Sequence, residues 1–167
     1  MRCFRLALLV LFLSPIPLLG ATVTLSAGPG QFEAKTLGPH SIKADIVAAI
    51  SLTEFNGTSA WPTAAYVGFH ENSNRDNSIQ FVLMRNKDTD TRLAIGYRVL
   101  KNGKEQFAEF IDWRPLGAQV AVKISCNEGL VTLQVGDMAP VKIQTSLGSV
   151  APYTSVSSGT AAFDIHP

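Results

Sequence analysis

Apolar and polar residues alternate along most of this chain, and most regularly between Ser78 and Thr145. Five alternating runs follow one another there, separated by short turns: 78–85, 91–101, 104–113, 118–126 and 130–145, the last bent at Gly136-Asp137. A period of two is typical of a strand with one buried face. Asn102-Gly103, between the second and third runs, predicts a type I′ hairpin, because that turn needs positive φ at both central residues.

The flanking segments predict further strands that cover or close this central stretch. Residues 41–52 keep the period of two throughout and contain no proline, so we expect a strand in the interior of a sheet. Its predicted inward residues are Ile42, Ala44, Ile46, Ala48, Ile50 and Leu52. Other predicted strands are 22–30 and 31–37, separated by a turn at Gly28-Pro29-Gly30, then 64–70 and 160–165.

The spacing of these runs predicts the fold class. Asn127-Glu128-Gly129 reads as a three-residue hairpin loop, and turn signals recur throughout while no segment predicts a helix of three turns. Such spacing is typical of an all-β antiparallel sandwich. We therefore expect a single antiparallel β-sandwich (jelly roll) domain of about ten to eleven strands over residues 22–167. Its predicted core includes Leu93, Ile95, Val120, Val122, Ile124, Val131 and Leu133.

The first 21 residues have the layout of a secretory signal peptide. Arg2 and Arg5 precede the apolar run 6–13, and small residues at Gly20 and Ala21 offer two cleavage points. The apolar run is shorter than the roughly 20 residues that a transmembrane helix needs. We expect a secreted or periplasmic protein without membrane insertion after cleavage.

Charge and cysteine content narrow the function classes. The formal net charge is +1, and removing Arg2 and Arg5 with the signal makes it −1. A near-neutral surface does not attract phosphate backbones, so nucleic acid is not an expected partner. Cys126 falls in phase with the inward residues of its run, which predicts a buried, inert thiol, with an intermolecular disulfide as the alternative.

The order of features from Tyr66 to Ile165 resembles the concanavalin A-like lectin/glucanase superfamily, including laminin G-like domains. The resemblance is carried by the segments 65–69, 78–83, 120–125, 129–137 and 157–163. In that family the third and fourth correspond to two strands joined by a small-residue hairpin. The resemblance implies a jelly roll that binds glycans on a sheet face or at loop tips, although some members hydrolyse glycosidic bonds.

The acidic motif of the hydrolases in that superfamily is missing here. The segment 105–112 has its acids at a different spacing, with Glu105 and Glu109 predicted on one strand face, roughly 13 Å apart, and Asp112 on the other. Glycoside hydrolysis uses two carboxylates about 5–10 Å apart. The sequence therefore favours a non-catalytic member, and no catalytic residue is assigned.

Two polar loops offer oxygen ligands at alternating positions. Such spacing suits Ca²⁺, and laminin G-like domains can hold Ca²⁺ with loop Asp and Asn. Neither loop has the glycine and glutamate of an EF-hand, and polar turns without a metal are the alternative interpretation. The candidate ligands are Asn72, Asn74, Asp76, Asp88 and Asp90.

Aromatic residues near arginines are the candidates for sugar contacts, because a pyranose presents both an apolar face and hydroxyls. Each could equally be a packing residue, since Trp and Tyr are highly buried on average. The pair Trp113-Arg114 stands out because it ends a strand at a turn. The candidate ligand-binding residues are Trp61, Tyr66, His70, Arg98, Trp113 and Arg114.

Three functions remain open from the sequence. The first is a secreted, non-catalytic binding module for a glycan or another extracytoplasmic ligand. The second is a structural or assembly subunit of an envelope protein complex, which a large exposed apolar patch would favour. The third is a small glycan-active hydrolase or lyase.

Overall fold

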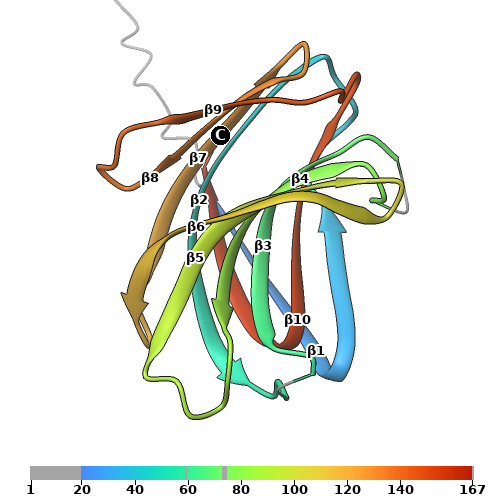
Figure 1. The fold of residues 1–167 in the computed structure, drawn as a ribbon. Coiled ribbons are helices and arrows are strands. Elements are labelled where there is room, and N and C mark those ends of the chain that lie inside the picture. The colour runs from blue at the N-terminus through green and yellow to red at the C-terminus, as the bar shows by residue number, and fades with distance from the viewer. Residues whose placement is uncertain (1–19, 59, 73–74, 167) are drawn as a thin grey trace, which may run out of the picture.

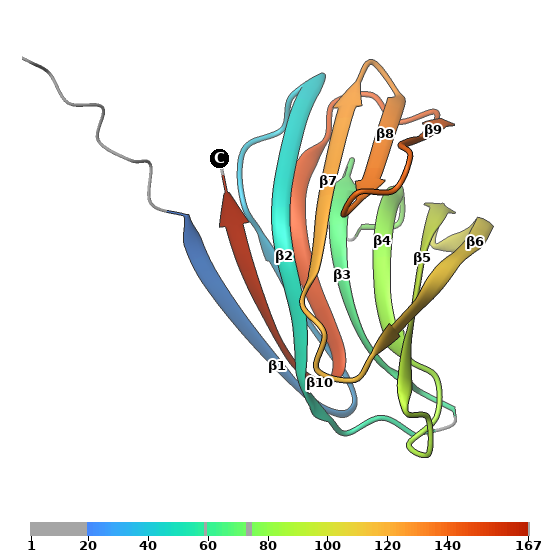
Figure 2. The ribbon, with the colours of Figure 1, turned by 90° about the vertical axis from the view of Figure 1, so that its left-hand side faces the viewer.

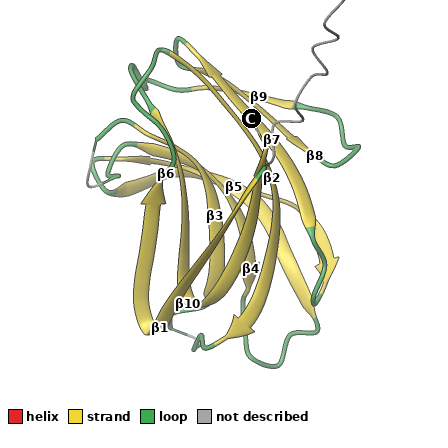
Figure 3. Ribbon diagram, turned by 180° about the vertical axis from the view of Figure 1, so that it is seen from behind, coloured by secondary structure: helices red, strands yellow, loops and turns green. Residues whose placement is uncertain are grey.

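The computed structural model describes residues 20–58, 60–72 and 75–166. Ten strands and no helix make up the described residues (Figure 3). The strands are β1 (Ala21–Thr36), β2 (Lys43–Phe55), β3 (Thr63–His70), β4 (Ser78–Arg85), β5 (Arg92–Lys101), β6 (Lys104–Pro115), β7 (Val120–Asn127), β8 (Leu130–Val135), β9 (Val141–Gln144) and β10 (Ala151–His166). The predicted all-β class and strand number are confirmed.

All strands pair antiparallel, in the order β6-β5-β4-β3-β10-β2-β7-β8-β9, with β1 added on β10. This continuous sheet folds over at β10 into two layers (Figure 1). One layer contains β3, β4, β5 and β6, and the other contains β2, β7, β8 and β9 (Figure 2). The arrangement is a curled β-sandwich of the jelly-roll type.

Strand β10 belongs to both layers. Its residues 151–157 pair with β3, and its residues 159–166 pair with β2. β1 also pairs with both halves of β10: residues 32–36 pair with the first half and residues 21–27 with the second. The strand that organises the fold thus lies outside the stretch 78–145 that the sequence pattern emphasised.

The crossing point of β10 is a tight corner at Ser158-Gly159. Ser158 has a φ of 46°, in a region that residues other than glycine rarely occupy. Its hydroxyl accepts a hydrogen bond from the Gly30 N–H (2.9 Å), and its carbonyl accepts one from the Thr63 hydroxyl (2.6 Å). A Cβ on Gly159 would lie 2.4 Å from the Glu54 carbonyl oxygen, so the corner requires glycine there. These contacts hold the bend in place.

The core lies between the two layers, and both layers contribute to it. All seven predicted core residues named above are buried, as are Phe69 and Phe81 from one layer and Phe163 from the other. Cys126 is a free, buried cysteine, as predicted, and burial raises the pKa of its thiol. Packing of alternate side chains therefore accounts for the sandwich.

Four local predictions need correction. The two strands predicted over 22–37 form one, β1, which ends at Thr36, since Gly28-Pro29-Gly30 is an irregularity within it. The β7–β8 loop has two residues, because Asn127 pairs with Leu130, and Glu128 and Gly129 both have positive φ. The last strand begins at Ala151 rather than Thr160. Ile42 precedes β2 and is 56% exposed, so it is not an inward residue.

Of two other predictions, the hairpin is confirmed and the signal peptide stays a prediction. The Asn102-Gly103 hairpin is confirmed, with φ values of 53° and 71°. The signal peptide falls almost entirely on residues 1–19, outside the described residues, and stays a prediction. No helix in the described part of the chain is long and apolar enough to span a membrane.

Candidate functional site

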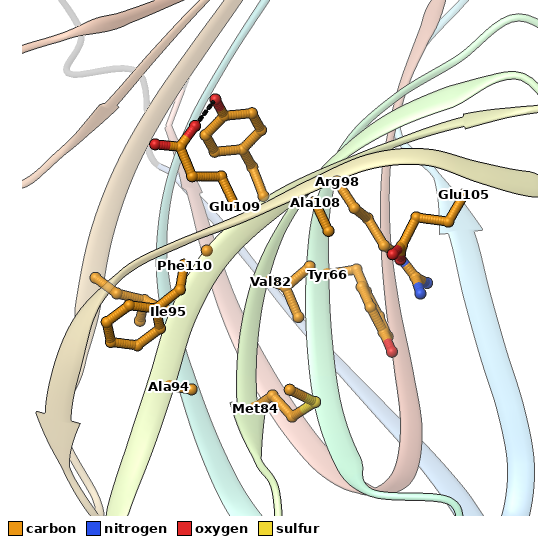
Figure 4. Close-up of a pocket in the computed structure, with 12 residues that line it drawn as sticks. Tyr66, Val82, Met84, Ala94, Ile95, Arg98, Glu105, Ala108, Glu109 and Phe110 are labelled. Atoms are coloured by element: carbon orange, nitrogen blue, oxygen red, sulfur yellow. Dashed lines mark hydrogen bonds between the residues drawn. The ribbon is translucent and has the colours of Figure 1, made fainter.

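The outer face of the β3–β6 layer, which points away from the core, contains a depression of about 320 Å³. Alternate residues of the four strands line it, because side chains of a strand point to opposite faces in turn. Figure 4 shows these side chains. Those that belong to the outer face are Tyr66, Val82, Met84, Ala94, Gly96, Arg98, Glu105, Ala108 and Phe110.

Two bulges in β6 decide which of its residues reach this face. The register with β5 shifts at Gln106 and again at Ile111, which have no partner. An extra residue moves every later side chain to the other face. The first bulge therefore brings Ala108 and Phe110 onto the same face as Glu105, and the second returns Trp113 to that face.

The bulges also overturn the predicted arrangement of the acids on this strand. Glu105 pairs with Leu100 on the outer face, whereas Glu109 pairs with the core residue Tyr97. Asp112 lies on the same side as Glu109, not opposite it. Glu105 and Glu109 thus lie on opposite faces, and the prediction that they share one was wrong because the bulges interrupt the alternation.

Glu109 turns away from the depression and bonds to a buried tyrosine. The Tyr97 hydroxyl donates to a carboxylate oxygen of Glu109 at 2.5 Å (Figure 4). Burial, followed by this hydrogen bond, raises the pKa of Tyr97 to about 12. This contact ties β5 to β6 on the core side.

Arg98 is held at one end of the depression by two neighbours. Its Nε donates to the Gln80 side-chain oxygen at 2.7 Å, and its guanidinium lies over the Tyr66 ring, 4.7 Å from the centroid. Gln80 in turn donates to the Ser78 hydroxyl at 3.0 Å. Stacking and hydrogen bonding fix the plane of the guanidinium. Tyr66 is 8% exposed, so Arg98 covers the ring face that a sugar would otherwise contact.

Phe110 is the exposed aromatic residue that lines the depression. Its side chain is 54% exposed, and its ring lies 5.1 Å from that of Trp113. Trp113 is 38% exposed and carries the Arg92 guanidinium over its ring at 4.7 Å. An apolar aromatic surface therefore continues along the outer face of β6.

His70 lies at the end of β3 in a buried cluster rather than in the depression. Its Nδ1 lies 2.7 Å from the Asn72 carbonyl oxygen, which can only accept, so Nδ1 carries a hydrogen. Nε2 lies 3.1 Å from the Thr36 hydroxyl, and the neutral ring accepts there. Burial lowers the pKa of His70, which favours this neutral form. His70 also contacts the His40 and Tyr153 rings edge to face.

The remaining candidate ligand residues lie elsewhere. Trp61 is exposed in the loop between β2 and β3, where its backbone N–H donates to the Thr58 carbonyl oxygen at 3.1 Å. Arg114 lies on the opposite face of β6 from the depression and forms an ion pair with Asp112. Of the six candidates, Tyr66 and Arg98 line the depression and Trp113 lies beside it.

The two loops predicted to hold Ca²⁺ form hydrogen bonds of their own. The Asn72 side-chain oxygen accepts from the Asn77 N–H at 3.4 Å, and the Asp76 carbonyl oxygen accepts from the Gly103 N–H at 3.0 Å. In the second loop, the Asp90 carboxylate accepts from the Lys87 N–H at 3.0 Å, and the Asp88 carbonyl oxygen accepts from the Arg85 guanidinium. Asn74 lies outside the described residues.

Metal binding at these loops stays a prediction. No group of three or more His, Cys, Asp or Glu residues within 20–58, 60–72 and 75–166 is arranged to hold a metal ion. Asn side chains and backbone carbonyl oxygens, which also bind Ca²⁺, do not count toward such a group.

Sequence reasoning missed Phe110, Glu105 and Met84 as site residues. The signal for Met84 was available, because it alternates with the inward residues of β4 in the same way as Gln80 and Val82. The signal for Glu105 and Phe110 was hidden by the bulges at Gln106 and Ile111, which the alternation of residues in β6 does not reveal.

No protein-family model and no curated protein matches this chain. Solved structures do match its fold. The carbohydrate-binding module CBM66 from Bacillus subtilis is 12% identical with a TM-score of 0.57, covering 88% of this chain and 94% of that one. An alginate lyase from Alteromonas sp. 272 is 8% identical with a TM-score of 0.59, covering 91% and 89%.

A third match is CG-16, a homodimeric agglutinin from chicken liver, with 13% identity, a TM-score of 0.51 and coverage of 82% and 97%. At such low identities these structures show the fold alone. This chain shares their fold, and these neighbours have jelly rolls of the concanavalin A-like type.

Proposed function

We propose that this chain is a secreted or periplasmic, non-catalytic module that binds a glycan on the outer face of the β3–β6 layer. The observation that carries the proposal is the depression in that face, where exposed Phe110 lies on the same surface as Arg98 and Glu105. An aromatic ring suits the apolar face of a sugar, and charged groups at its side suit the hydroxyls. Similar folds include a carbohydrate-binding module and an agglutinin, which makes this use of the face reasonable.

The acids support binding rather than hydrolysis by a pair of carboxylates. Such hydrolysis needs two carboxylates that approach one bond from the same site. Among the residues that line the depression, Glu105 is on the outer face, while Glu109 is on the other and bonds to Tyr97.

Replacing Phe110 tests the proposal, with Phe107 as a matched control. Both are exposed phenylalanines on β6, at 54% and 48%, but Phe107 lies on the opposite face against Tyr97. Binding to a panel of polysaccharides (alginate, levan, xylan, chitin and β-galactans) is measured by affinity electrophoresis and calorimetry. We expect Phe110→Ala and Arg98→Ala each to weaken binding about tenfold, which corresponds to roughly 1.4 kcal/mol. Phe107→Ala is expected to leave it unchanged.

Two results would count against the proposal. One is the absence of binding to every polysaccharide in the panel. The other is an equal loss of affinity in the Phe107 and Phe110 variants, which would indicate a general effect on β6. Release of new reducing ends or unsaturated products from a bound polysaccharide would show that the chain is an enzyme and not a binding module. An alginate lyase is among the proteins of similar fold.

A second candidate function is assembly through β6, and one observation favours it. β6 is the edge strand of its layer, and its first seven residues are exposed on both faces. Phe107, Phe110 and Trp113 leave apolar surface on the two sides of this open edge. Exposed apolar edges pair readily with another strand, and a second copy of this chain offers one in its own β6.

Light scattering of the purified chain tests this second function. Pairing of two β6 edges predicts the mass of two chains, and Gln106→Pro or Phe107→Lys is expected to restore the mass of one. A single-chain mass at every concentration at which the protein stays dissolved would rule out self-pairing through β6.

A further inference from the structure

The two ends of the depression differ in chemistry, and this difference limits which sugar fits it. β4 and β5 pair across its floor in three successive rows: Gln80 opposite Arg98, Val82 opposite Gly96, and Met84 opposite Ala94. Successive rows on one face of a strand lie about 7 Å apart. The surface therefore changes from polar to apolar over roughly the length of one sugar and its substituent.

The polar end presents hydrogen-bond donors. Gln80 and Tyr66 hold Arg98 through its Nε and its guanidinium face. The contacts described for Arg98 leave its two terminal amino groups available on the side of the depression, where Glu105 also lies (Figure 4). These donors suit a hydroxyl or a carbonyl oxygen of a ligand.

The floor of the depression is aliphatic at its other end, where Val82, Met84 and Ala94 lie. The side chains of Val82, Met84 and Ala94 carry no hydrogen-bond donor, and the backbone of β4 and β5 pairs across these rows. A sugar hydroxyl placed there would lose its water without gaining a partner, which disfavours it. A methyl group there would be removed from water against three aliphatic side chains, which favours it.

We propose that this depression selects acetylated sugars, with the acetyl methyl against Val82, Met84 and Ala94 and the polar atoms of the same sugar toward Arg98. This inference rests on the proposed glycan-binding function and specifies its ligand class. An acetyl group combines a methyl with a carbonyl oxygen, so it matches both ends of the surface. The volume of about 320 Å³ is at the lower limit of ordinary ligand pockets, a size that suits one substituted sugar.

The methionine methyl groups give a direct readout. The sequence has three methionines, of which Met84 lines the depression and Met138 packs at the edge of the core, within 3.6 Å of an Arg114 nitrogen on the other side of β6. The chain is labelled with methyl-¹³C methionine and titrated with N-acetyl-D-glucosamine and N-acetyl-D-galactosamine, each against glucose or galactose. We expect the acetylated sugars to shift the Met84 signal and not that of Met138, with an affinity about tenfold or more above the parent hexoses.

A Met84→Gln variant tests whether packing of the acetyl methyl against Met84 causes the preference. Glutamine keeps the length of the side chain and adds polar atoms, so we expect the affinity for acetylated sugars to fall about tenfold relative to that for the parent hexoses. Circular dichroism checks that the variant is folded. The titration of the wild-type chain tests the inference even if the variant does not fold.

The outcomes separate this inference from the proposed function. If acetylated and parent sugars shift Met84 with equal affinity, the acetyl preference is wrong and glycan binding stands. If sugars bind without shifting Met84, the site is elsewhere and the inference is wrong. If neither these sugars nor any polysaccharide of the panel binds, both fail.

Discussion

Two buried tyrosines show how much a single hydroxyl matters in this molecule. The Tyr97 hydroxyl donates to the Glu109 carboxylate, whereas no described residue forms a hydrogen bond with the Tyr153 hydroxyl. Burial raises the pKa of both to about 12. The Ser78 and Gln80 side chains near Tyr153 act in the opposite direction on its pKa but do not reach hydrogen-bonding geometry.

Removing the two hydroxyls should change stability in opposite directions. Tyr97→Phe loses a hydrogen bond to a charged group, so we expect the free energy of unfolding to fall by about 1 kcal/mol. Tyr153→Phe removes a buried hydroxyl without a protein partner, so we expect it to rise by about 1 kcal/mol. Denaturant unfolding at neutral pH measures both. An equal loss in the two variants would show that Tyr153 has a partner in solution.

The raised pKa values of Tyr97 and Tyr153 also predict how the free energy of unfolding depends on alkaline pH, which gives a second measurement for these variants. The folded pKa of about 12 lies above the ordinary value of 10.0, so the folded state holds these protons more tightly than the unfolded chain. Their contribution is complete below pH 10 and is lost as pH rises toward 12. Each Phe variant is expected to reduce this decline in the free energy of unfolding.

Residue roles were predictable from the sequence only where local pattern decides them. The burial of Cys126 followed from its phase within β7. The burial of Tyr66 did not, because Arg98 covers it from β5, two strands away. Nor could the sequence show that Phe110 rather than Tyr66 presents an exposed ring.

At the scale of strands, glycine is needed where two backbones come close. A Cβ on Gly68 of β3 would lie 1.9 Å from the Ile79 carbonyl oxygen of β4, whereas Gly117, with a φ of 78°, has nothing within 4 Å of such a Cβ. The first position is constrained by space and the second by backbone conformation alone.

Alanine at these two glycines is expected to have different costs. Gly68→Ala forces β3 and β4 apart in the middle of the sheet, at about 3 kcal/mol. Gly117→Ala costs about 1 kcal/mol, since only the left-handed conformation is penalised. Thermal unfolding of both variants measures the difference, and equal losses would contradict this reading of the β3–β4 contact.

The sequence predicted the strands more reliably than their irregularities. The observed strands cover the expected segments, although 22–30 and 31–37 merge into β1 and 130–145 divides into β8 and β9. Asn102-Gly103 forms the predicted hairpin because its turn chemistry is local. The bulges at Gln106 and Ile111 depend on how β6 pairs with β5, so no pattern within β6 could reveal them. The corner at Ser158 likewise depends on contacts with Gly30 and Thr63, which are far away in sequence.

At the scale of the molecule, alternation predicted a sandwich but not its pairing. The stretch 78–145 supplies six strands, β4 to β9, yet the two layers are joined by β10, which the sequence presented as a closing strand. A period of two shows which face of a strand is buried, but it does not show which strands pair with it. The candidate site inherits this limit, because the depression exists only once β3, β4, β5 and β6 lie side by side.

The place of β10 in both layers has a consequence for how the chain acquires its structure. β10 follows the other nine strands in the sequence, yet β2 and β3 both pair with it. As a ribosome synthesises the chain, neither layer can be completed until residues beyond Val150 have emerged. Contacts between β1 and β10 span more than a hundred residues, and such long-range closure is slow. The pairing of the two layers through β10 can therefore form only after the last of the ten strands has been synthesised.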